Sequence, residues 1–306
     1  MEPSRHQVVC FGEVLWDILP TGALPGGAPM NVAYHLKKLG INPALITKIG
    51  ADDYGEKLVN ILSHSEVTTE YFQVDYTYPT GLVYANVDDH QEVRYDIVFP
   101  SAWDYTEYKE EDAGIVSQAD FFVFGSLTSR NKASRDTLYQ LLDVARTKVL
   151  DINLRPPHYS RSSIESLLQR ADILKMNEAE LELITGWFSG FDGIEDRMKL
   201  VQEHFALGKI IVTLGGDGAM VLDAGKFYRH KGYKVSVADT IGSGDSFLAG
   251  FLAQLLQGNT IENALDFASG IGAFIATQSG ACPQYEISQI TELMNSGKSK
   301  KLQTIL

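Results

Sequence analysis

Short apolar runs alternate with amphipathic segments along most of the chain. Continuous apolar runs, rather than alternating ones, are typical of strands covered by helices on both faces. The pattern therefore predicts an α/β fold with a central, mostly parallel β-sheet flanked by helices. The predicted strands are Val8–Phe11, Ala44–Ile49, Phe121–Phe124, Lys148–Ile152, Ile173–Met176 and Lys209–Leu214. The helix-like segments between them are Asn31–Leu39, Tyr54–Ser63, Ser134–Arg146, Ile164–Arg170, Ala179–Thr185 and Ile194–Phe205.

Several stretches depart from this rhythm and predict strands outside the main sheet. Val14–Leu19 follows the first strand and ends at Pro20-Thr21-Gly22. Gly81–Val87 and Val93–Phe99 flank the turn-like triplet Asp88-Asp89-His90. We expect these segments to form antiparallel ribbons that stand off the main sheet.

The last third of the chain predicts a hairpin, two packed helices and a tail. Ala219–Leu222 and Lys226–His230 are expected to pair as a structural hairpin. Ser246–Gln257 and Ala264–Thr277 are apolar, with slim faces rich in Ala and Gly, so these two helices should pack closely. Ser296–Lys300 is expected to belong to a solvated tail.

Composition and charge narrow the class of protein. The chain has 306 residues and a formal net charge of −13, which argues against nucleic acid or an anionic membrane as a partner. Cys10 and Cys282 lie far apart and form no metal-binding spacing. No stretch has membrane-spanning length, and no long apolar segment stands at the N-terminus. We expect one domain over residues 1–306, located in the cytoplasm.

The heptapeptide Asp239-Thr240-Ile241-Gly242-Ser243-Gly244-Asp245 is the strongest chemical signal. It follows a β-like run, Tyr233–Ala238, and leads into a predicted helix. Gly242 and Gly244 would free backbone amides at the mouth of that helix, where an anion binds well. Asp245 in the same mouth could accept a proton from an attacking hydroxyl. The alternative is a plain turn with an N-capping aspartate. Neither a Walker A lysine nor a dinucleotide fingerprint is present.

A second motif, Gly26-Gly27-Ala28-Pro29-Met30-Asn31-Val32-Ala33, precedes the first predicted helix. Its glycines let a ligand approach the backbone closely. Asn31 can both donate and accept hydrogen bonds. The alternative is a glycine turn followed by an Asn N-cap.

Together the two motifs resemble those of the ribokinase-like (PfkB-type) carbohydrate kinases, and the resemblance covers nearly the whole chain. Gly26-Gly27-x-x-x-Asn31-x-Ala33 matches the N-terminal signature of that family, and Asp239–Asp245 matches the C-terminal one. Smaller elements also match. They are Gly12-Glu13-x-x-x-Asp17, Asp151-Ile152-Asn153-Leu154-Arg155 (with Ile152 where sugar kinases have proline), Asn177-Glu178-Ala179-Glu180 and Thr213–Gly218. Without the family context, the Asn177–Glu180 element would equally describe a helix start, and Arg155 a surface arginine.

The resemblance implies a ribokinase-like α/β fold with a small β-sheet lid, formed by approximately residues 13–25 and 81–104. It also implies transfer of the γ-phosphoryl group of ATP to a sugar hydroxymethyl group. In that reaction Asp245 would be the general base, the amides of Gly242, Ser243 and Gly244 would stabilise the phosphoryl charge, and Arg155 would contact phosphate or sugar.

The same resemblance implies binding roles for further residues. The sugar would be bound by Asp17, Gly26, Gly27 and Asn31, beside Arg155 and Asp245. ATP would be bound by Asn177, Glu180, Thr213, Gly215, Gly218, Gly242 and Gly244. Mg²⁺ would be held through water by Asn177 and Glu180. A monovalent cation such as K⁺ would lie at Asp239 and Ile241, with residues near Ala276 and Gly280 as further ligands.

The motifs look most like those of the fructokinase branch, so D-fructose is the expected substrate. Ala28-Pro29 departs from the Lys-Gly typical of ribokinases, whereas Tyr95–Phe99 in the lid is unusual for a fructokinase. Ribose, 2-keto-3-deoxygluconate, nucleosides and sugar phosphates such as tagatose 6-phosphate stay open. Two other classes stay open as well: a non-catalytic sugar-binding regulatory protein on this fold, and a nicotinamide-dependent oxidoreductase. Exposed lid edges favour a homodimer that pairs through the lid.

Overall fold

The computed structural model describes residues 5–20, 22–87, 93–188 and 193–302. Within these residues the main sheet has nine strands, and its order is β13-β12-β11-β10-β9-β8-β1-β4-β5. From β5 to β11 neighbouring strands are parallel, and β12 and β13 add an antiparallel hairpin at one edge. All six predicted strands and the predicted hairpin are confirmed. The strands are β1 (Val8–Phe11), β4 (Pro43–Gly50), β5 (Phe72–Asp75), β8 (Phe121–Gly125), β9 (Lys148–Asp151), β10 (Ile173–Asn177), β11 (Lys209–Thr213), β12 (Ala219–Asp223) and β13 (Lys226–His230).

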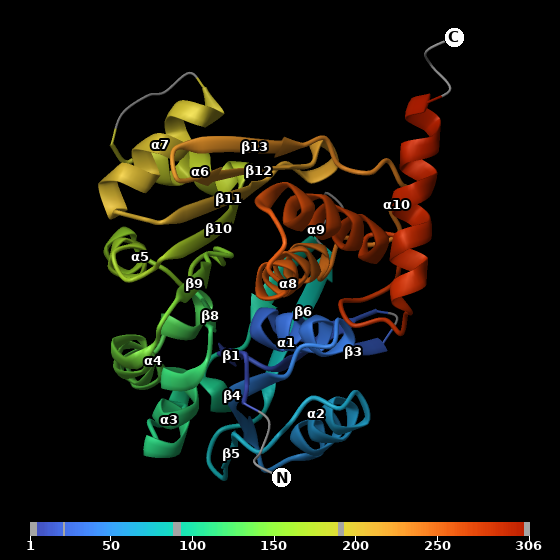
Figure 1. The fold of residues 1–306 in the computed structure, drawn as a ribbon. Coiled ribbons are helices and arrows are strands. Elements are labelled where there is room, and N and C mark those ends of the chain that lie inside the picture. The colour runs from blue at the N-terminus through green and yellow to red at the C-terminus, as the bar shows by residue number, and fades with distance from the viewer. Residues whose placement is uncertain (1–4, 21, 88–92, 189–192, 303–306) are drawn as a thin grey trace.

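Helices cover both faces of this sheet, as Figure 1 shows. Strand β1 explains the apolar runs, because Val8 and Cys10 pack into the core on one face while Val9 and Phe11 pack into the core on the other. One face carries α3 (Glu110–Gln118), α4 (Lys132–Val144), α5 (Arg161–Leu168), α6 (Glu178–Thr185) and α7 (Ile194–Phe205). The other carries α1 (Ala28–Lys38), α2 (Asp53–His64), α8 (Ser243–Leu256) and α9 (Ile261–Ile275), with α10 (Ile287–Leu302) packed against α9.

Two predicted segments differ from the structure. Tyr233–Ala238 is not a strand, because it leaves the sheet after β13 and runs along α9. There the Tyr233 hydroxyl donates to Asp266, and the Ala238 amide donates to the Ala276 carbonyl. Ser296–Lys300 lies inside α10 rather than in an irregular tail, and α10 packs against the core through Ile290 and Met294.

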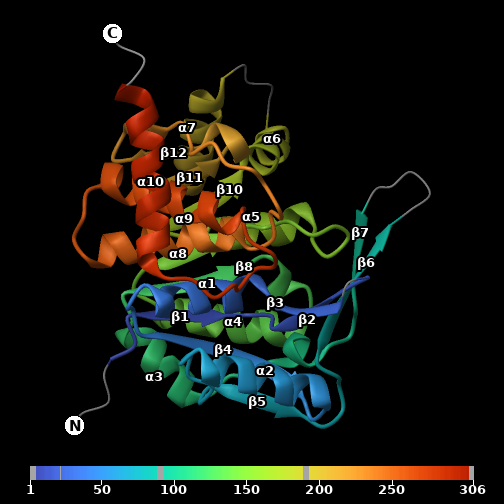
Figure 2. The same cartoon turned by 90° about the vertical axis from the view of Figure 1, so that its right-hand side faces the viewer.

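A second, smaller sheet lies at the segments predicted to form the lid, and it is called the lid below. Its strands are β2 (Leu15–Leu19), β3 (Gly22–Gly26), β6 (Gly81–Val87) and β7 (Val93–Ile97), in the order β3-β2-β6-β7. The predicted ribbons are antiparallel, as expected, but a parallel pairing of β2 with β6 joins them into one sheet. Figure 2 shows β6 and β7 projecting away from the body of the molecule. The predicted turn Asp88-Asp89-His90 lies outside the described residues.

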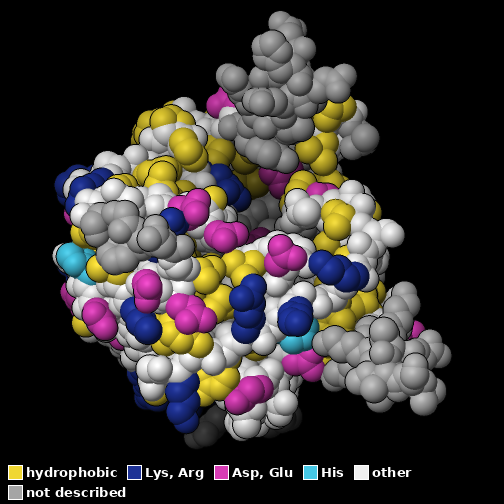
Figure 3. All heavy atoms as spheres, turned by 90° about the horizontal axis from the view of Figure 1, so that it is seen from above, with side chains coloured by type: hydrophobic (Ala, Val, Ile, Leu, Met, Phe, Trp, Pro, Cys, Tyr) yellow, Lys and Arg dark blue, Asp and Glu magenta, His cyan; other side chains and the backbone are white. Residues whose placement is uncertain are grey.

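The surface carries both signs of charge. On the face seen in Figure 3, Lys and Arg side chains are interspersed with Asp and Glu side chains. Among the described residues, none of the helices is long and apolar enough to cross a membrane.

Candidate active site

A cleft of about 580 Å³ lies between the lid and the carboxyl ends of the parallel strands. Open α/β sheets bind ligands at this end of their strands. The cleft brings together residues from β9, β10, β11, the segment after β1, the lid, and the starts of α1, α6 and α8. Of the residues predicted for the site, it is lined by Asp17, Gly27, Asn31, Arg155, Asn177, Glu180, Thr213, Ile241, Gly242, Gly244 and Asp245.

Asp245 lies at the centre of this arrangement as the third residue of α8. The residue is only 9% exposed, and its carboxylate accepts a 2.7 Å hydrogen bond from Asn31 Nδ2. Burial raises its pKa to about 6, helped by the negative charge of Asp151 and opposed by Lys175, Asn31 and Arg155. A carboxylate with a pKa near neutrality is well suited to accept a proton from a hydroxyl at physiological pH.

The start of α8 has the backbone geometry expected of the anion site that the glycines predict. Gly242 has φ 75°, and a Cβ there would lie 2.6 Å from Cα of Ala281, so both the conformation and the space require glycine. The first amides of a helix have no acceptor within it and carry partial positive charge. Gly242 and Gly244 both line the cleft, so these amides lie beside Asp245.

Asn31 is not an N-cap. Helix α1 begins at Ala28 with Pro29 in its first turn, and Asn31 is its fourth residue. The Asn31 side chain therefore points from the helix flank into the cleft, where it binds Asp245. Its other end, Oδ1, accepts a 3.3 Å hydrogen bond from the thiol of Cys282, a contact the sequence did not suggest.

Five predicted residues do not line the cleft. A Cβ on Gly26 would collide with the Asp17 carboxylate, so Gly26 leaves room for that side chain. Ser243 Oγ turns away and donates to the Gly272 carbonyl in α9. Gly215 and Gly218 lie in the turn after β11, where a Cβ on Gly218 would collide with the backbone of β13. The fifth residue is Asp239.

Asp239 braces the loop before α8. Its two carboxylate oxygens accept hydrogen bonds from the amides of Ile241, at 3.0 Å, and Gly280, at 3.2 Å. The Asp239 amide itself approaches the Ala276 carbonyl. The residues expected around a monovalent cation are therefore neighbours.

Asn177 and Glu180 form a reciprocal capping box at the start of α6. The Glu180 carboxylate accepts amide hydrogen bonds from Asn177 and Leu154, both at 2.8 Å. Both residues line the cleft and present oxygen atoms, the ligand type that Mg²⁺ prefers. In the described part of the chain, no group of three or more His, Cys, Asp or Glu side chains could hold a metal directly. That finding is compatible with Mg²⁺, which keeps several waters and binds substrate phosphates.

Two acidic side chains beside the cleft have strongly raised pKa values. Burial raises the pKa of Glu13 to about 7 despite hydrogen bonds from its own amide and from Thr128. Burial likewise raises the pKa of Asp17, on lid strand β2, to about 6, with Arg155 opposing the shift. Glu13 belongs to the Gly12–Asp17 motif, in which a role was expected for Asp17 alone.

Lys175 was missed entirely, because it lies within an otherwise apolar predicted strand. It is the register partner of Asp151 on the neighbouring strand, and the two side chains form a buried 2.7 Å ion pair on the cleft wall. Burial would lower the pKa of Lys175, but the charges of Asp151, Asp245 and Glu180 raise it. A lysine near the carboxyl end of a buried strand was the signal available in the sequence.

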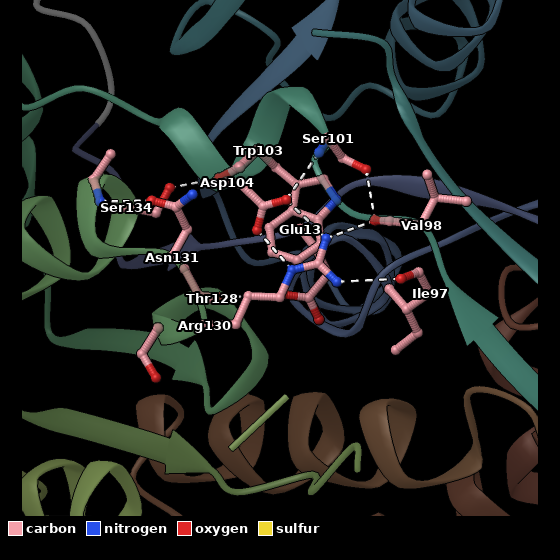
Figure 4. A network of polar contacts seen from close by, with 12 residues as sticks. Glu13, Ile97, Val98, Ser101, Trp103, Asp104, Thr128, Arg130, Asn131 and Ser134 are labelled. Carbon is pink, nitrogen blue, oxygen red and sulfur yellow. Dashed lines mark hydrogen bonds and ion pairs between the residues drawn. The ribbon is translucent and has the colours of Figure 1, made fainter. Parts of the chain in front are cut away.

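The lid is anchored to the body by Arg130, shown in Figure 4. The Arg130 guanidinium donates two hydrogen bonds to the buried Asp104 carboxylate, at 2.6 and 2.7 Å, and one of 2.7 Å to the Val98 carbonyl. It also lies 4.0 Å from the ring centroid of Trp103. Trp103 in turn packs so closely under β6 that a Cβ on Gly81 would lie 2.5 Å from its indole nitrogen. This network holds the end of β7 and the start of β6 beside the cleft.

Arg155 lines the cleft from an exposed loop, so its position differs from that of Lys175. Within the described residues, its guanidinium donates a hydrogen bond to the adjacent Leu154 carbonyl, at 3.3 Å. It nevertheless lies near enough to lower the pKa values of Asp17 and Asp245.

Comparison with known proteins agrees with this geometry. Residues 8–287 match the model of the pfkB family carbohydrate kinases. Probable fructokinase-7 of Arabidopsis thaliana is 30% identical over 327 residues, which cover 97% of this chain and 94% of that protein. Probable fructokinase-6, chloroplastic, of the same plant is 31% identical over 305 residues, covering 90% and 79%.

Solved structures share the fold. Fructokinase from Xylella fastidiosa with bound ATP has a TM-score of 0.85 at 21% identity, covering 95% of this chain and 99% of that one. Fructokinase from Vibrio cholerae O395, bound to fructose, ADP and calcium ion, has a TM-score of 0.81 at 25% identity, covering 94% and 99%. A double mutant of the Vibrio enzyme with fructose, ADP and potassium ion has a TM-score of 0.81 at 24% identity, covering 96% and 100%. The ribokinase-like fold is confirmed, and the chain belongs to the pfkB family of carbohydrate kinases.

Proposed function

We propose that this carbohydrate kinase transfers the γ-phosphoryl group of ATP to a hydroxymethyl group of D-fructose. The observation that carries the proposal is the position of Asp245, a buried carboxylate with a pKa of about 6 beside the amides that begin α8. The names of the curated relatives and the fructose bound in the Vibrio cholerae enzyme favour fructose among the sugars.

In this mechanism the sugar lies between the lid and Asn31. Asp17 accepts hydrogen bonds from sugar hydroxyls, because a carboxylate can accept from two neighbouring groups. Asp245 accepts the proton of the attacking hydroxyl, and the amides of Gly242, Ser243 and Gly244 stabilise charge on the phosphoryl group. Arg155 enters from its exposed loop to contact phosphate or sugar. The Thr213 end of β11 and the turn through Gly215 and Gly218 contact the nucleotide.

Ions complete the proposed site. Mg²⁺, held through water by Asn177 and Glu180, would neutralise the charge of the ATP phosphates. K⁺ near Asp239 and Ile241 would stabilise the loop that carries the anion site. The lid covers the reacting groups, so water is excluded and wasteful hydrolysis of ATP is limited.

Two properties of the whole protein belong to the same proposal. The edge strands β3 and β7 leave unpaired backbone groups that a second copy of the chain could cover, which favours a homodimer. Cys10 and Cys282 are free thiols, and this suits a reducing compartment such as the cytoplasm.

A coupled ADP-release assay over a sugar panel tests the function. The panel contains fructose, ribose, 2-keto-3-deoxygluconate, adenosine and phosphorylated sugars. We expect the highest kcat/KM with fructose. A fructose rate below a tenth of the best rate would reject the substrate and keep the kinase. Sugar binding without any sugar-dependent ADP release would favour the non-catalytic binding protein instead.

A further inference from the structure

The buried pair of Lys175 and Asp151 has no role in the mechanism described above. The two side chains are 9% and 5% exposed, and Lys175 Nζ lies 2.7 Å from Asp151 Oδ2. They are register partners on β10 and β9, so they point from the same face of the sheet into the cleft. A buried ion pair is weak evidence for added stability, because desolvation of the charges can exceed their mutual attraction. Its position in the cleft is therefore the more informative property.

Lys175 lies against the anion site. A Cβ built on Gly244 would come within 2.9 Å of Lys175 Nζ, closer than real Cβ contacts allow. Gly244 thus lets the ammonium group approach the first turn of α8. The partial positive charge at the start of α8 and the charge of Lys175 would consequently attract an anion to the same part of the cleft.

The Lys175 ammonium group also has N–H donors that could bind a ligand. An ammonium group carries three N–H donors, and in the described part of the chain its hydrogen-bond partner is Asp151 Oδ2. Asp151 holds the lysine from the side of the sheet and leaves the other donors available in the cleft.

The cleft is lined by several acidic residues, so a cation there would reduce the repulsion of ATP phosphates. Glu13, Asp17, Asp151, Glu180 and Asp245 line it, so its electrostatic potential would repel ATP phosphates. Two cationic side chains are among the lining residues, and the other, Arg155, is exposed. Lys175 is the cation held in place by burial and by a short ion pair.

We propose that Lys175 is a catalytic residue that contacts the transferring phosphoryl group, and that Asp151 is the positioning residue that holds it. The inference rests on the proposed phosphoryl transfer. A bond forms between the sugar hydroxymethyl oxygen and the γ-phosphorus while the bond from that phosphorus to the β–γ bridging oxygen breaks. The hydroxyl proton passes to Asp245. Lys175 stays protonated and donates hydrogen bonds to the phosphoryl oxygens from the sheet side, beside the amides of α8.

Paired substitutions separate this role from a structural one. Lys175→Met alone leaves Asp151 buried without a counter-charge, and this is itself destabilising. Lys175→Met/Asp151→Asn removes both charges and keeps the volumes similar. We expect kcat of the double variant to fall about 100-fold, the usual effect of removing one donor to developing charge, with KM for the sugar unchanged within about twofold. Lys175→Arg should restore part of kcat.

The chain offers a matched control in Lys48 and Asp75. This Lys–Asp pair is also buried, with side chains 10% and 8% exposed at 2.9 Å, and lies on β4 and β5 of the same sheet, outside the cleft lining. Lys48→Met/Asp75→Asn should change thermal stability and leave kcat within about twofold. If Lys175→Met/Asp151→Asn behaved in the same way, the pair would be structural and the proposal would be wrong.

Binding of a transition-state mimic decides the question independently of the sugar. Calorimetry with ADP and Mg²⁺, with and without aluminium fluoride, compares ground-state and transition-state affinity. We expect Lys175→Met/Asp151→Asn to bind ADP nearly normally and to lose most of the extra affinity gained with aluminium fluoride. Equal gains in the variant and the unmodified protein would overturn the role of Lys175. If fructose fails but another sugar is phosphorylated, that sugar is used in the kinetic arm. If the unmodified protein binds no nucleotide, the proposed function fails first and this inference fails with it.

Discussion

Asn31 Nδ2 donates a 2.7 Å hydrogen bond to Asp245 Oδ2, which links α1 to the start of α8. The Cys282 thiol donates to Asn31 Oδ1 and so orients the Asn31 amide group with its nitrogen toward Asp245. The bond from Asn31 engages Oδ2 of the Asp245 carboxylate, and we expect Oδ1 to accept the substrate proton. Helix α1, which carries the proposed sugar ligand Asn31, is in this way connected to the start of α8 through the proposed base, Asp245.

Removal of the Asp245 carboxylate should abolish most of the activity without unfolding the protein. We expect Asp245→Asn to lower kcat by about 10²–10⁴-fold, the range attributed to general base catalysis. Steady-state ADP release measures the effect, and the far-UV circular dichroism spectrum controls for folding. A folded Asp245→Asn protein with near-normal kcat would remove Asp245 from the role of base.

The pH profile of kcat/KM should report the same carboxyl. Since burial raises the pKa of Asp245 to about 6, the base is protonated and inactive below that pH. We expect kcat/KM to fall roughly tenfold per pH unit below about pH 6 and to be level just above it. Asn31→Ala removes a hydrogen bond that stabilises the charged form, so its acid limb should move to higher pH. An acid limb centred near pH 4 in both proteins would contradict the assignment.

The buried charge of Asp245 should also cost stability, with a definite sign. Its pKa in the folded state exceeds the ordinary value of 3.8, so the folded protein binds this proton more tightly than the unfolded chain. The penalty is absent below about pH 4 and complete above about pH 6. Asp245→Asn should therefore raise the free energy of unfolding by about 1–3 kcal/mol at pH 8 and by little at pH 4. Denaturant titrations at the two pH values measure the difference, and equal stabilities at pH 8 would argue against a penalty from this charge.

The sequence predicted those features that are encoded locally. The parallel strands were predicted because each is a short apolar run with both faces covered. The glycine-rich start of α8 was recognisable because Gly242, Gly244 and Asp245 lie within four residues of one another, and its role as an anion site stays a prediction. Tyr233–Ala238 was wrongly predicted to be a strand, because its local pattern resembles that of a strand. Its half-buried and exposed positions follow from packing along α9, with Tyr233 bonded to Asp266, rather than from strand pairing.

The features that were missed depend on contacts between distant segments. Asp151 and Lys175 meet only because β9 and β10 pair in one register, which no local pattern specifies. Cys282 is 251 residues from Asn31 in sequence. Strand β5 was missed because Phe72–Asp75 is a short, partly exposed strand at the sheet edge and lacks a continuous apolar run.

The contacts of Arg130 with the lid should affect how tightly the sugar binds. Arg130→Met would leave the Asp104 carboxylate buried without its counter-charge, at a cost of about 3–5 kcal/mol. Arg130→Met/Asp104→Asn avoids that cost. It removes the guanidinium hydrogen bonds to the Ile97 and Val98 carbonyls at the end of β7, together with the contact of the guanidinium with the Trp103 ring. Because Ile97 and Val83 of the lid line the cleft, we expect this double variant to raise KM for the sugar about tenfold, which corresponds to about 1.4 kcal/mol. The KM for ATP should change far less, since the proposed nucleotide contacts lie at β11 and α8. Steady-state kinetics with each substrate varied in turn measure both values, and an equal rise in the two KM values would show that the anchor supports the whole cleft rather than the lid.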